Sequence, residues 1–240
     1  MTYYKFILII ILNIAHLEDI NSSANYNIFN KKLNYILEFQ NISAGNGYIL
    51  LEKDSLNNQS IIKLKSEIKT NKYVDWFYKI RNQITIYMDN SDFSLIKVIN
   101  KINEGKYKKN HNALIDIKNM KIINEKGEKD IKQKLHSPLS IIFSIREKII
   151  SLEKNFQYRI YSNGKQKNIN ISLIGKEKIK TPFGEFNTLI FNPTSTNNKP
   201  VLKNSGDMKI WYTDDNKKLP IKIELKIKYG SIILLLDNIE

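Results

Sequence analysis

Apolar and polar residues alternate with a period of two along most of the chain. The clearest run follows Pro220, where isoleucine and leucine at positions 221, 223, 225 and 227 alternate with lysine and glutamate. This alternation is typical of a β-strand with one face in a core and one in water, and proline is tolerated at a strand's start. The same pattern predicts further strands or hairpins within residues 33–40, 48–52, 60–70, 83–89, 95–123, 157–194 and 206–232.

Short glycine-containing and polar stretches separate these strands. Gly45 and Gly47 allow a turn or bulge, and Glu104–Gly105 supplies the positive φ angle of a tight hairpin. Asn163–Gly164 and Pro182–Phe183–Gly184 predict two more turns. We expect a further β element at 120–123, a solvated loop at 124–134 and a polar loop at 192–206.

One segment has helical rather than strand periodicity. Ser137 is suited to cap a helix and Pro138 to occupy its first position, and apolar residues follow at spacings of three and four up to Ile150. We therefore predict a helix over Pro138–Ile150, buried against the concave face of the sheet. A second segment, residues 74–81, predicts a helical turn or an irregular crossover. Its aromatic residues are expected to fill a core: Trp76, Phe77 and Tyr78.

The first 24 residues resemble a secretory signal peptide. Lys5 precedes an apolar run from Phe6 to Ala15, and the small residues at 22–24 form a candidate cleavage site. The apolar run is short for a membrane-spanning helix. We interpret residues 1–24 as a signal peptide or N-terminal anchor and residues 25–240 as a single β-rich domain, a buried first helix being the alternative.

The chain is strongly basic, with a formal net charge of +14 over 240 residues. Only three of its 38 basic residues are arginine, the better reader of bases and phosphates, and the lysines are spread along the whole chain. We expect no nucleic-acid partner. A basic surface does favour peripheral contact with an anionic membrane.

The residue types needed for common catalytic and metal sites are sparse. The chain has no cysteine, and its histidines are His16, His111 and His136, of which the last two are expected in polar, loop-like surroundings. No pair of histidines has zinc-ligand spacing, and no nucleophile elbow occurs. Adjacent Asp214 and Asp215 suit a turn better than a catalytic dyad. We expect no catalytic residues, no metal, no cofactor and no enzyme activity.

Four segments together resemble a family of bacterial exported proteins, domain of unknown function 3108. They are DWFYKIRNQITIYMD, SPLSIIFSIR, KTPFGEFNTLIFNP and MKIWYTDDNKKLPIKIELKIKYGSI, and the resemblance covers residues 34–238. It implies a cell-envelope protein, in the periplasm or associated with the outer membrane of a Gram-negative-type bacterium. It also implies a mainly β fold in which a curved antiparallel sheet forms an open barrel or half-barrel around one helix, similar to lipoprotein-localisation factors.

With polar chemistry set aside, the apolar interior is the remaining candidate for function. Trp76, Phe143 and Trp211 are predicted to line a ligand cavity, the alternative being that they fill it. The leading hypothesis is a non-enzymatic exported protein that binds or shields a lipid, a lipidated protein or another hydrophobic ligand. A structural or assembly module with an envelope-protein partner is the second hypothesis. A hydrolase or transferase acting on envelope glycans is the third.

Overall fold

The computed structural model describes residues 26–56, 58–151, 153–162, 164–195, 207–227 and 230–240. Some sequence predictions lie wholly or partly outside the described residues: the signal peptide at 1–24, Asn163 of one predicted turn, residues 196–206 of the predicted polar loop, and positions 206, 228 and 229 of the strands predicted at 206–232. The division into a leader and a single domain stays a prediction.

The described chain consists of a long series of strands interrupted by two helices. The elements are β1 (Lys32–Phe39), β2 (Ile42–Leu56), β3 (Gln59–Thr70), α1 (Lys72–Tyr78), β4 (Arg81–Asp89), β5 (Leu95–Glu104), β6 (Tyr107–Asp116), β7 (Lys121–Asn124), β8 (Gly127–Asp130), α2 (Ser140–Ile150), β9 (Asn155–Ser162), β10 (Lys165–Thr181), β11 (Gly184–Ser195), β12 (Asp207–Thr213), β13 (Pro220–Ile227) and β14 (Gly230–Ile239).

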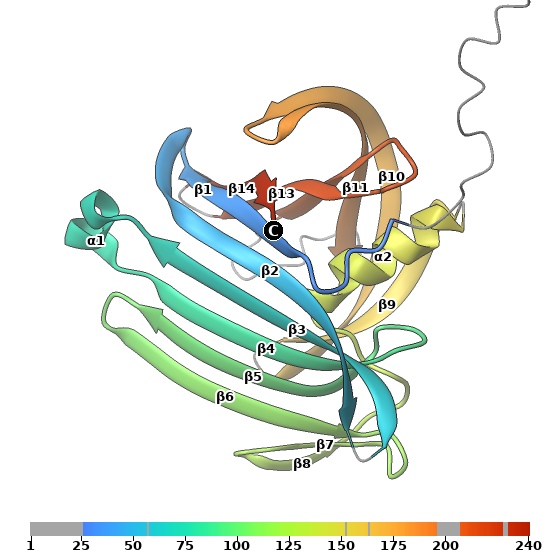
Figure 1. Ribbon diagram of the computed structural model, residues 1–240. Helices are drawn as coiled ribbons and strands as arrows, with labels where there is room; N and C mark the ends of the chain where they lie inside the picture. The colour runs from blue at the N-terminus through green and yellow to red at the C-terminus, as the bar shows by residue number, and fades with distance from the viewer. Residues whose placement is uncertain (1–25, 57, 152, 163, 196–206, 228–229) are drawn as a thin grey trace, which may run out of the picture.

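All fourteen strands belong to one sheet in the order β8-β7-β6-β5-β4-β3-β2-β1-β14-β13-β12-β11-β10-β9. Every neighbouring pair is antiparallel, and the pairing of β1 with β14 joins the two halves of the chain in the middle of the sheet. The sheet curls around α2 without closing by strand pairing, so β8 and β9 are its two edges (Figure 1). The predicted curved, open antiparallel barrel around one helix is confirmed.

The first hairpin shows why two glycines occur inside a strand. The chain reverses at Gln40 and Asn41, with φ angles of 49° and 63°, and not at the glycines. Gly45 lies within β2, where an added Cβ would stand 2.1 Å from the carbonyl oxygen of Lys69. The β1–β2 register shifts opposite this position. Of the two predicted alternatives, the bulge is therefore confirmed and the turn is wrong.

The other predictions for turns and loops have mixed outcomes. Gly105 has a φ of 56° in the β5–β6 hairpin, and the turn before Gly184 joins β10 to β11, as predicted. The β element predicted near residues 120–123 is also present as β7. The polar run 124–134 is not simply a loop, because it contains β8, which pairs with β7. All four residues of β8 are exposed and none is a large apolar residue, so no apolar alternation marked the strand.

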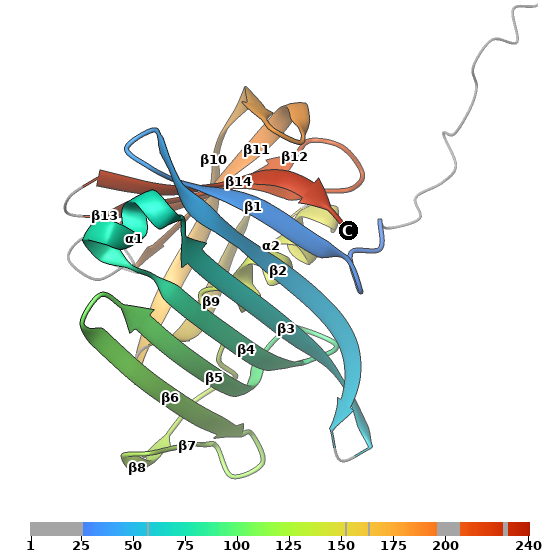
Figure 2. The same cartoon turned by 60° about the vertical axis from the view of Figure 1, so that its left-hand side comes forward.

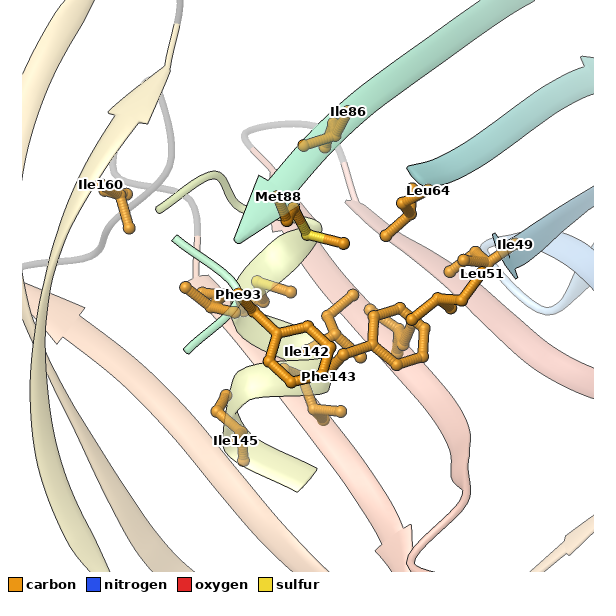
Figure 3. Packing of buried hydrophobic residues seen from close by; sticks show 14 of the residues in the cluster. Ile49, Leu51, Leu64, Ile86, Met88, Phe93, Ile142, Phe143, Ile145 and Ile160 are labelled. Carbon is orange, nitrogen blue, oxygen red and sulfur yellow. The ribbon is translucent and has the colours of Figure 1, made fainter. Parts of the chain in front are cut away.

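Helix α2 occupies the concave side of the sheet and forms the centre of the core (Figure 3). It begins at Ser140, two residues later than predicted, and Ser137 and Ser140 bond each other's backbone amides at 3.0 and 2.8 Å in the turn before it. Burial extends around most of the helix surface, since the sheet wraps it. Its buried residues are Ser140, Ile141, Ile142, Phe143, Ser144, Ile145, Arg146 and Ile149.

Polar contacts hold α2 to both walls of the barrel. The Tyr212 hydroxyl on β12 donates to the carbonyl oxygen of Ile142 at 2.7 Å, and the hydroxyls of Ser144 and Tyr158 are 2.7 Å apart. Arg146 is only 3% exposed and donates to the backbone carbonyls of Lys217 and Tyr26. Because a buried guanidinium without partners is very costly, these bonds specify how deep the helix sits.

Neither described helix meets the length and hydropathy that crossing a bilayer as a single span requires.

Candidate functional site

The open seam of the barrel lies between the β6–β7 side of the sheet and β9. The segment before α2, which includes Leu135 and His136, lies across this seam, and no regular ladder of paired strands closes it among the residues that the structure describes. The amide of Leu95 donates to Leu135, while His136 exchanges backbone bonds with Arg159 and Tyr161 of β9 at 2.8 and 2.7 Å. Few backbone hydrogen bonds therefore hold this side of the barrel compared with the continuous ladders elsewhere.

Four side chains form a polar cluster across the same seam, called here the seam cluster: His111, Asn124, Glu125 and Tyr161. His111 Nδ1 lies 2.8 Å from Glu125 Oε1, and its Nε2 lies 3.0 Å from the Tyr161 hydroxyl. Asn124 Nδ2 donates to that hydroxyl at 3.2 Å. All groups are satisfied if His111 donates from Nδ1 and accepts from Tyr161 at Nε2.

The chemistry of the seam cluster suits a structural link between strands better than a nucleophilic catalytic site. Burial raises the pKa of Tyr161 above its usual value, so its phenol keeps its proton. The hydrogen bond from His111 lowers the pKa of Glu125, which keeps that carboxylate charged. The cluster therefore ties β6 and β7 to β9 through side chains alone.

Beside the cluster is a cavity of about 170 Å³ on the concave side of the sheet, called here the seam cavity. Its walls are mostly aliphatic, and the seam cluster contributes two of its residues. For scale, an apolar cavity of about 150 Å³ in another protein holds benzene. The lining residues are Ile84, Ile86, Val98, Asn100, Ile102, His111, Ser137, Pro138, Leu139, Tyr161 and Ser162.

One polar atom in the cavity wall has no partner. The Oδ1 atom of Asn100 is buried and accepts no hydrogen bond within the described part of the chain. Leaving such an acceptor unpaired costs about 1–3 kcal/mol. A donor group that entered the cavity could pair with this atom.

Two larger hollows have different walls. One, of about 390 Å³, lies over β1, β2, β3 and β14 and includes Lys32, Glu67 and Lys69. The other, of about 440 Å³, lies over β4, β5 and β6 and includes Arg81 and Lys101. Their charged and amide-rich linings do not fit an apolar ligand, so the seam cavity is the better candidate.

The structure does not bring Trp76, Phe143 and Trp211 together. Phe143 is fully buried in the core around α2 (Figure 3). Trp211 lies on the face of β12 opposite Ile210 and Tyr212, where its indole nitrogen bonds Glu177 and Lys222 Nζ stands 4.1 Å from the ring centroid. None of the three lines the seam cavity. A ligand contact for each one stays a prediction.

Trp76 belongs to α1, the short helix that connects β3 to β4. The predicted helical turn is confirmed, but the prediction that its aromatic residues fill a core is wrong. Trp76 is 81% exposed, Phe77 78% and Tyr78 49%, and no residue of α1 is buried. The helix stands beyond the ends of the strands, so no layer covers it (Figures 1 and 2).

The sequence reading missed the seam cluster. His111 was expected in a loop, but it lies on β6 and is 4% exposed. The available signal was its alternation with Ala113 and Ile115, which places all three on the same face of a strand. Its partner Tyr161 is 50 residues away in the chain, so no local pattern could join them.

Asp214 and Asp215 form a turn, as predicted. Asp215 Oδ1 accepts bonds from the amides of Lys217 and Lys218 at 2.9 and 3.2 Å, and Asp214 pairs with Lys176 at 2.8 Å. Within the described residues, no group of three or more histidines and carboxylates is placed to hold a metal ion. The expectations of no metal, no cofactor and no catalysis stay predictions.

A search of curated proteins found no match. Among solved structures, the chain is similar to the crystal structure of a β-barrel-like protein of domain of unknown function DUF1849 from Brucella abortus. That match has a TM-score of 0.61 and 10% identity and covers 89% of this chain and 98% of the other. At this identity the likeness concerns the fold alone. The family model described as "Protein of unknown function (DUF3108)" matches residues 33–237, and the chain therefore belongs to that family.

Proposed function

We propose that this protein is a non-enzymatic, exported envelope protein that binds a hydrophobic ligand, such as the end of a lipid chain, in the seam cavity. The observation that carries the proposal is an aliphatic cavity that contains an unpaired buried acceptor and lies beside the weakly closed side of the barrel. A filled interior surrounds α2, so the ligand has to lie outside that core.

The cavity volume limits how much of a ligand is sheltered. A space of this size accommodates about six carbon atoms, by comparison with benzene in a cavity of about 150 Å³. Burying about six methylenes contributes about 5 kcal/mol, which corresponds to a dissociation constant of a few tenths of a millimolar. Tighter binding of a longer chain requires the seam to open. The seam cluster is suited to that movement, because it joins the edges through side chains.

Asn100 supplies the polar part of the recognition. A ligand with a hydroxyl, amide or protonated carboxyl group would donate to its Oδ1 and remove the cost of the unpaired acceptor. Replacing Asn100 with leucine should therefore stabilise the free protein by about 1 kcal/mol and weaken ligand binding. These opposite signs distinguish a binding residue from a purely structural one. A variant that loses both stability and binding would contradict this role.

A cavity-filling pair of variants tests the site directly. Val98 is 5% exposed and lines the cavity, whereas Ile99 is its neighbour on β5 and faces the other side of the sheet. Val98→Phe should abolish binding of a fluorescent fatty acid such as cis-parinaric acid, and Ile99→Phe should retain it. Mass spectrometry of lipids extracted from the native protein provides the second readout. Equal binding by both variants, with the fold intact, would overturn the proposal.

Export is proposed from the pattern of residues 1–24 and from the family resemblance. Amino-terminal sequencing of protein recovered from the periplasm or outer membrane should find a start near residue 25. Recovery from the cytoplasm with Met1 intact would contradict export and leave the cavity proposal standing.

An assembly module of the envelope is the second candidate, favoured by the free edge of β6. β7 pairs only with Ala113–Asp116, so Tyr107–Asn112 has a strand neighbour on one side within the described chain. An exposed edge can accept a strand from a partner. Lys108 and Lys109 lie on it, and lysines on edges commonly prevent such pairing. Site-specific cross-linking from Asn110 should capture an envelope protein if this candidate is right.

A further inference from the structure

Helix α1 presents an unusual group of exposed aromatic side chains, called here the aromatic tip: Tyr73, Trp76, Phe77, Tyr78 and Tyr107. Their exposed fractions run from 49% to 81%. Trp76 and Phe77 pack edge to face with ring centroids 4.5 Å apart, so they form one apolar surface. A contiguous exposed surface of this kind marks an interaction site, whereas single exposed apolar residues do not.

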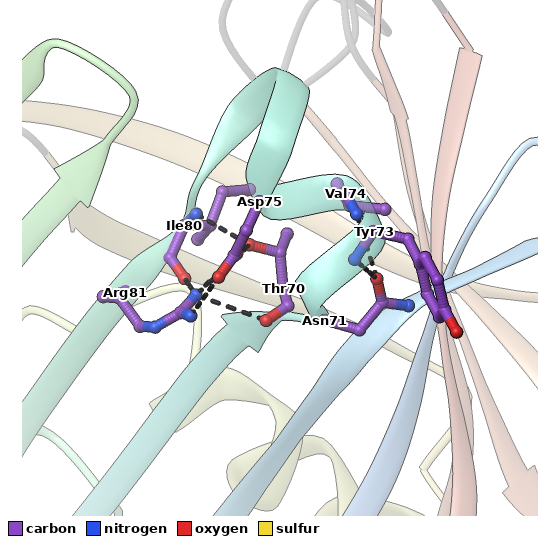
Figure 4. A network of polar contacts seen from close by, with 7 residues as sticks. All are labelled: Thr70, Asn71, Tyr73, Val74, Asp75, Ile80 and Arg81. Carbon is purple, nitrogen blue, oxygen red and sulfur yellow. Dashed lines mark hydrogen bonds and ion pairs between the residues drawn. The ribbon is translucent and has the colours of Figure 1, made fainter.

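The aromatic tip is held rigidly, although nothing covers it. Asn71 caps α1 by accepting the amides of Tyr73 and Val74, both at 3.0 Å (Figure 4). Arg81 forms a two-pronged ion pair with Asp75, and Arg81 also donates to the carbonyl oxygen of Thr70. The Arg81 guanidinium lowers the pKa of Asp75 below its usual value. These bonds of Arg81 attach α1 to the end of β3 and the start of β4.

The neighbouring β5–β6 turn is part of the same surface. The amide of Gly105 donates to the carbonyl oxygen of Lys79 at 2.8 Å. A Cβ at Gly105 would lie 3.0 Å from the Tyr78 ring, so the turn requires a glycine to bring that ring so close. Tyr107 follows two residues later. The aromatic tip thus spans two adjacent connections at one end of the barrel.

Exposed lysines accompany these aromatic residues, and the carboxylates of Asp75 and Glu104 nearby are bonded to other residues. The lysines, called here the tip lysines, are Lys72, Lys79, Lys106 and Lys108, all exposed. Asp75 is neutralised by Arg81, whereas Glu104 accepts a bond from the neutral amide of Asn82 at 2.6 Å and keeps its charge. With four lysines beside it, the tip combines apolar rings with a net positive charge.

This combination distinguishes between the surfaces that could cover the tip. Protein interfaces are enriched in aromatic residues but depleted in lysine. Tryptophan and tyrosine concentrate at the level of lipid headgroups, and lysines beside them attract anionic lipids. We propose that the aromatic tip and the tip lysines dock this protein on the surface of an anionic lipid bilayer, with Trp76 and Phe77 inserted at headgroup depth.

Docking at this end goes beyond ligand binding and does not depend on it. It would also bring the seam cavity towards the membrane. Ile102, which lines the cavity, is two residues from Glu104, and Glu104 is bridged to Ile80 immediately after α1. A ligand that moved between the bilayer and the seam cavity would therefore travel a short distance.

Trp76 provides the readout for the test, because the chain has only two tryptophans and Trp211 is 4% exposed. The full chain is mixed with vesicles of phosphatidylglycerol and phosphatidylethanolamine, or with phosphatidylcholine alone. With the anionic vesicles, emission should shift to shorter wavelength, and brominated phosphatidylglycerol should quench it. Both effects should disappear in Trp76→Phe. Trp76 lies outside residues 1–24, so its emission reports on contact at α1.

Charge and apolar contact are tested by separate variants. Lys79→Gln combined with Lys106→Gln should weaken vesicle binding at least tenfold at low salt, and raising the salt should weaken binding by the wild type. Trp76→Ser combined with Phe77→Ser should abolish vesicle binding measured by co-sedimentation, a readout that does not depend on Trp76 fluorescence. Ile174→Ser is the control, an apolar residue on β10 that is 51% exposed, and it should change nothing.

Three results would overturn the proposal. The first is an unchanged Trp76 spectrum with anionic vesicles. The second is a concentration-dependent shift without vesicles, which would assign the tip to a second copy of the chain. The third is a shift caused only by an envelope protein fraction freed of lipid, which would assign it to a protein partner.

Discussion

The two helices of the described chain have opposite surroundings, although both carry large aromatic residues. Phe143 of α2 is 0% exposed, while Trp76 of α1 is 81% exposed. Helix α2 crosses the concave side of a sheet that wraps it, whereas α1 replaces a turn beyond the ends of β3 and β4. An aromatic residue is buried when another layer lies opposite, so residue type alone does not decide its role.

Truncating the central aromatic residue of each helix sharpens this comparison most. Phe143→Ala should lower the free energy of unfolding by about 3–5 kcal/mol, because it leaves a cavity in a packed core. Trp76→Ala should change the free energy of unfolding by no more than about 0.5 kcal/mol, because the Trp76 side chain is mostly exposed to solvent in the folded protein. Urea denaturation followed by circular dichroism measures both. Similar losses in the two variants would refute the contrast.

The two helices should also differ in their response to mild acid. His136 precedes α2, its Nε2 lies 3.0 Å from the carbonyl oxygen of Asp92, and burial lowers its pKa below the usual 6.5. The unfolded chain therefore binds a proton more readily, and stability should fall as the pH decreases below about 6.5. Neither helix contains a histidine, and no histidine flanks α1 as His136 flanks α2.

Denaturation of the wild type and His136→Gln at pH 7.5 and pH 5.0 isolates this effect. The wild type should lose more stability than the variant on acidification. An equal loss in both proteins would place the pH dependence elsewhere.

A smaller effect is expected from the bond that joins α2 to β12. Tyr212→Phe removes the hydroxyl that donates to Ile142 and leaves the ring in the core. The expected loss is about 1 kcal/mol. Tyr73→Phe on α1 is the comparison, since Tyr73 is 72% exposed, and it should leave the unfolding midpoint unchanged.

The smallest effect is expected at the adjacent aspartates. In Asp214→Asn combined with Asp215→Asn, the amide oxygen at 215 still accepts the backbone bonds of the turn. Stability should change by no more than about 0.5 kcal/mol, and binding of cis-parinaric acid should not change. A large loss of binding would show that these carboxylates act beyond the turn.

Much of the fold was predictable because its signals are local. Residues 221–226 alternate in the sequence, and their strand pairs with both neighbours as such a strand should. The apolar spacing after Ser137 predicted α2 to within two residues. β8 was missed because its exposed side chains leave only backbone pairing to define it.

The candidate sites were less predictable, because each depends on residues that meet only after folding. The seam cluster joins His111 to Tyr161 across 50 residues, and the seam cavity draws on β4, β5, β6 and the turn before α2. Trp211 was placed correctly on a strand, but the face it occupies depends on the register of β12 with β13.

By itself, the sequence determined that this chain forms an antiparallel β-rich fold with a buried helix, since strand and helix periodicities arise from backbone geometry over a few residues. It also contained the motifs of the family to which the chain belongs. Only the tertiary structure decided which apolar residues fill the core, which line the seam cavity and which stand exposed on α1. Burial depends on what lies opposite a side chain, and that depends on how distant strands curve around α2.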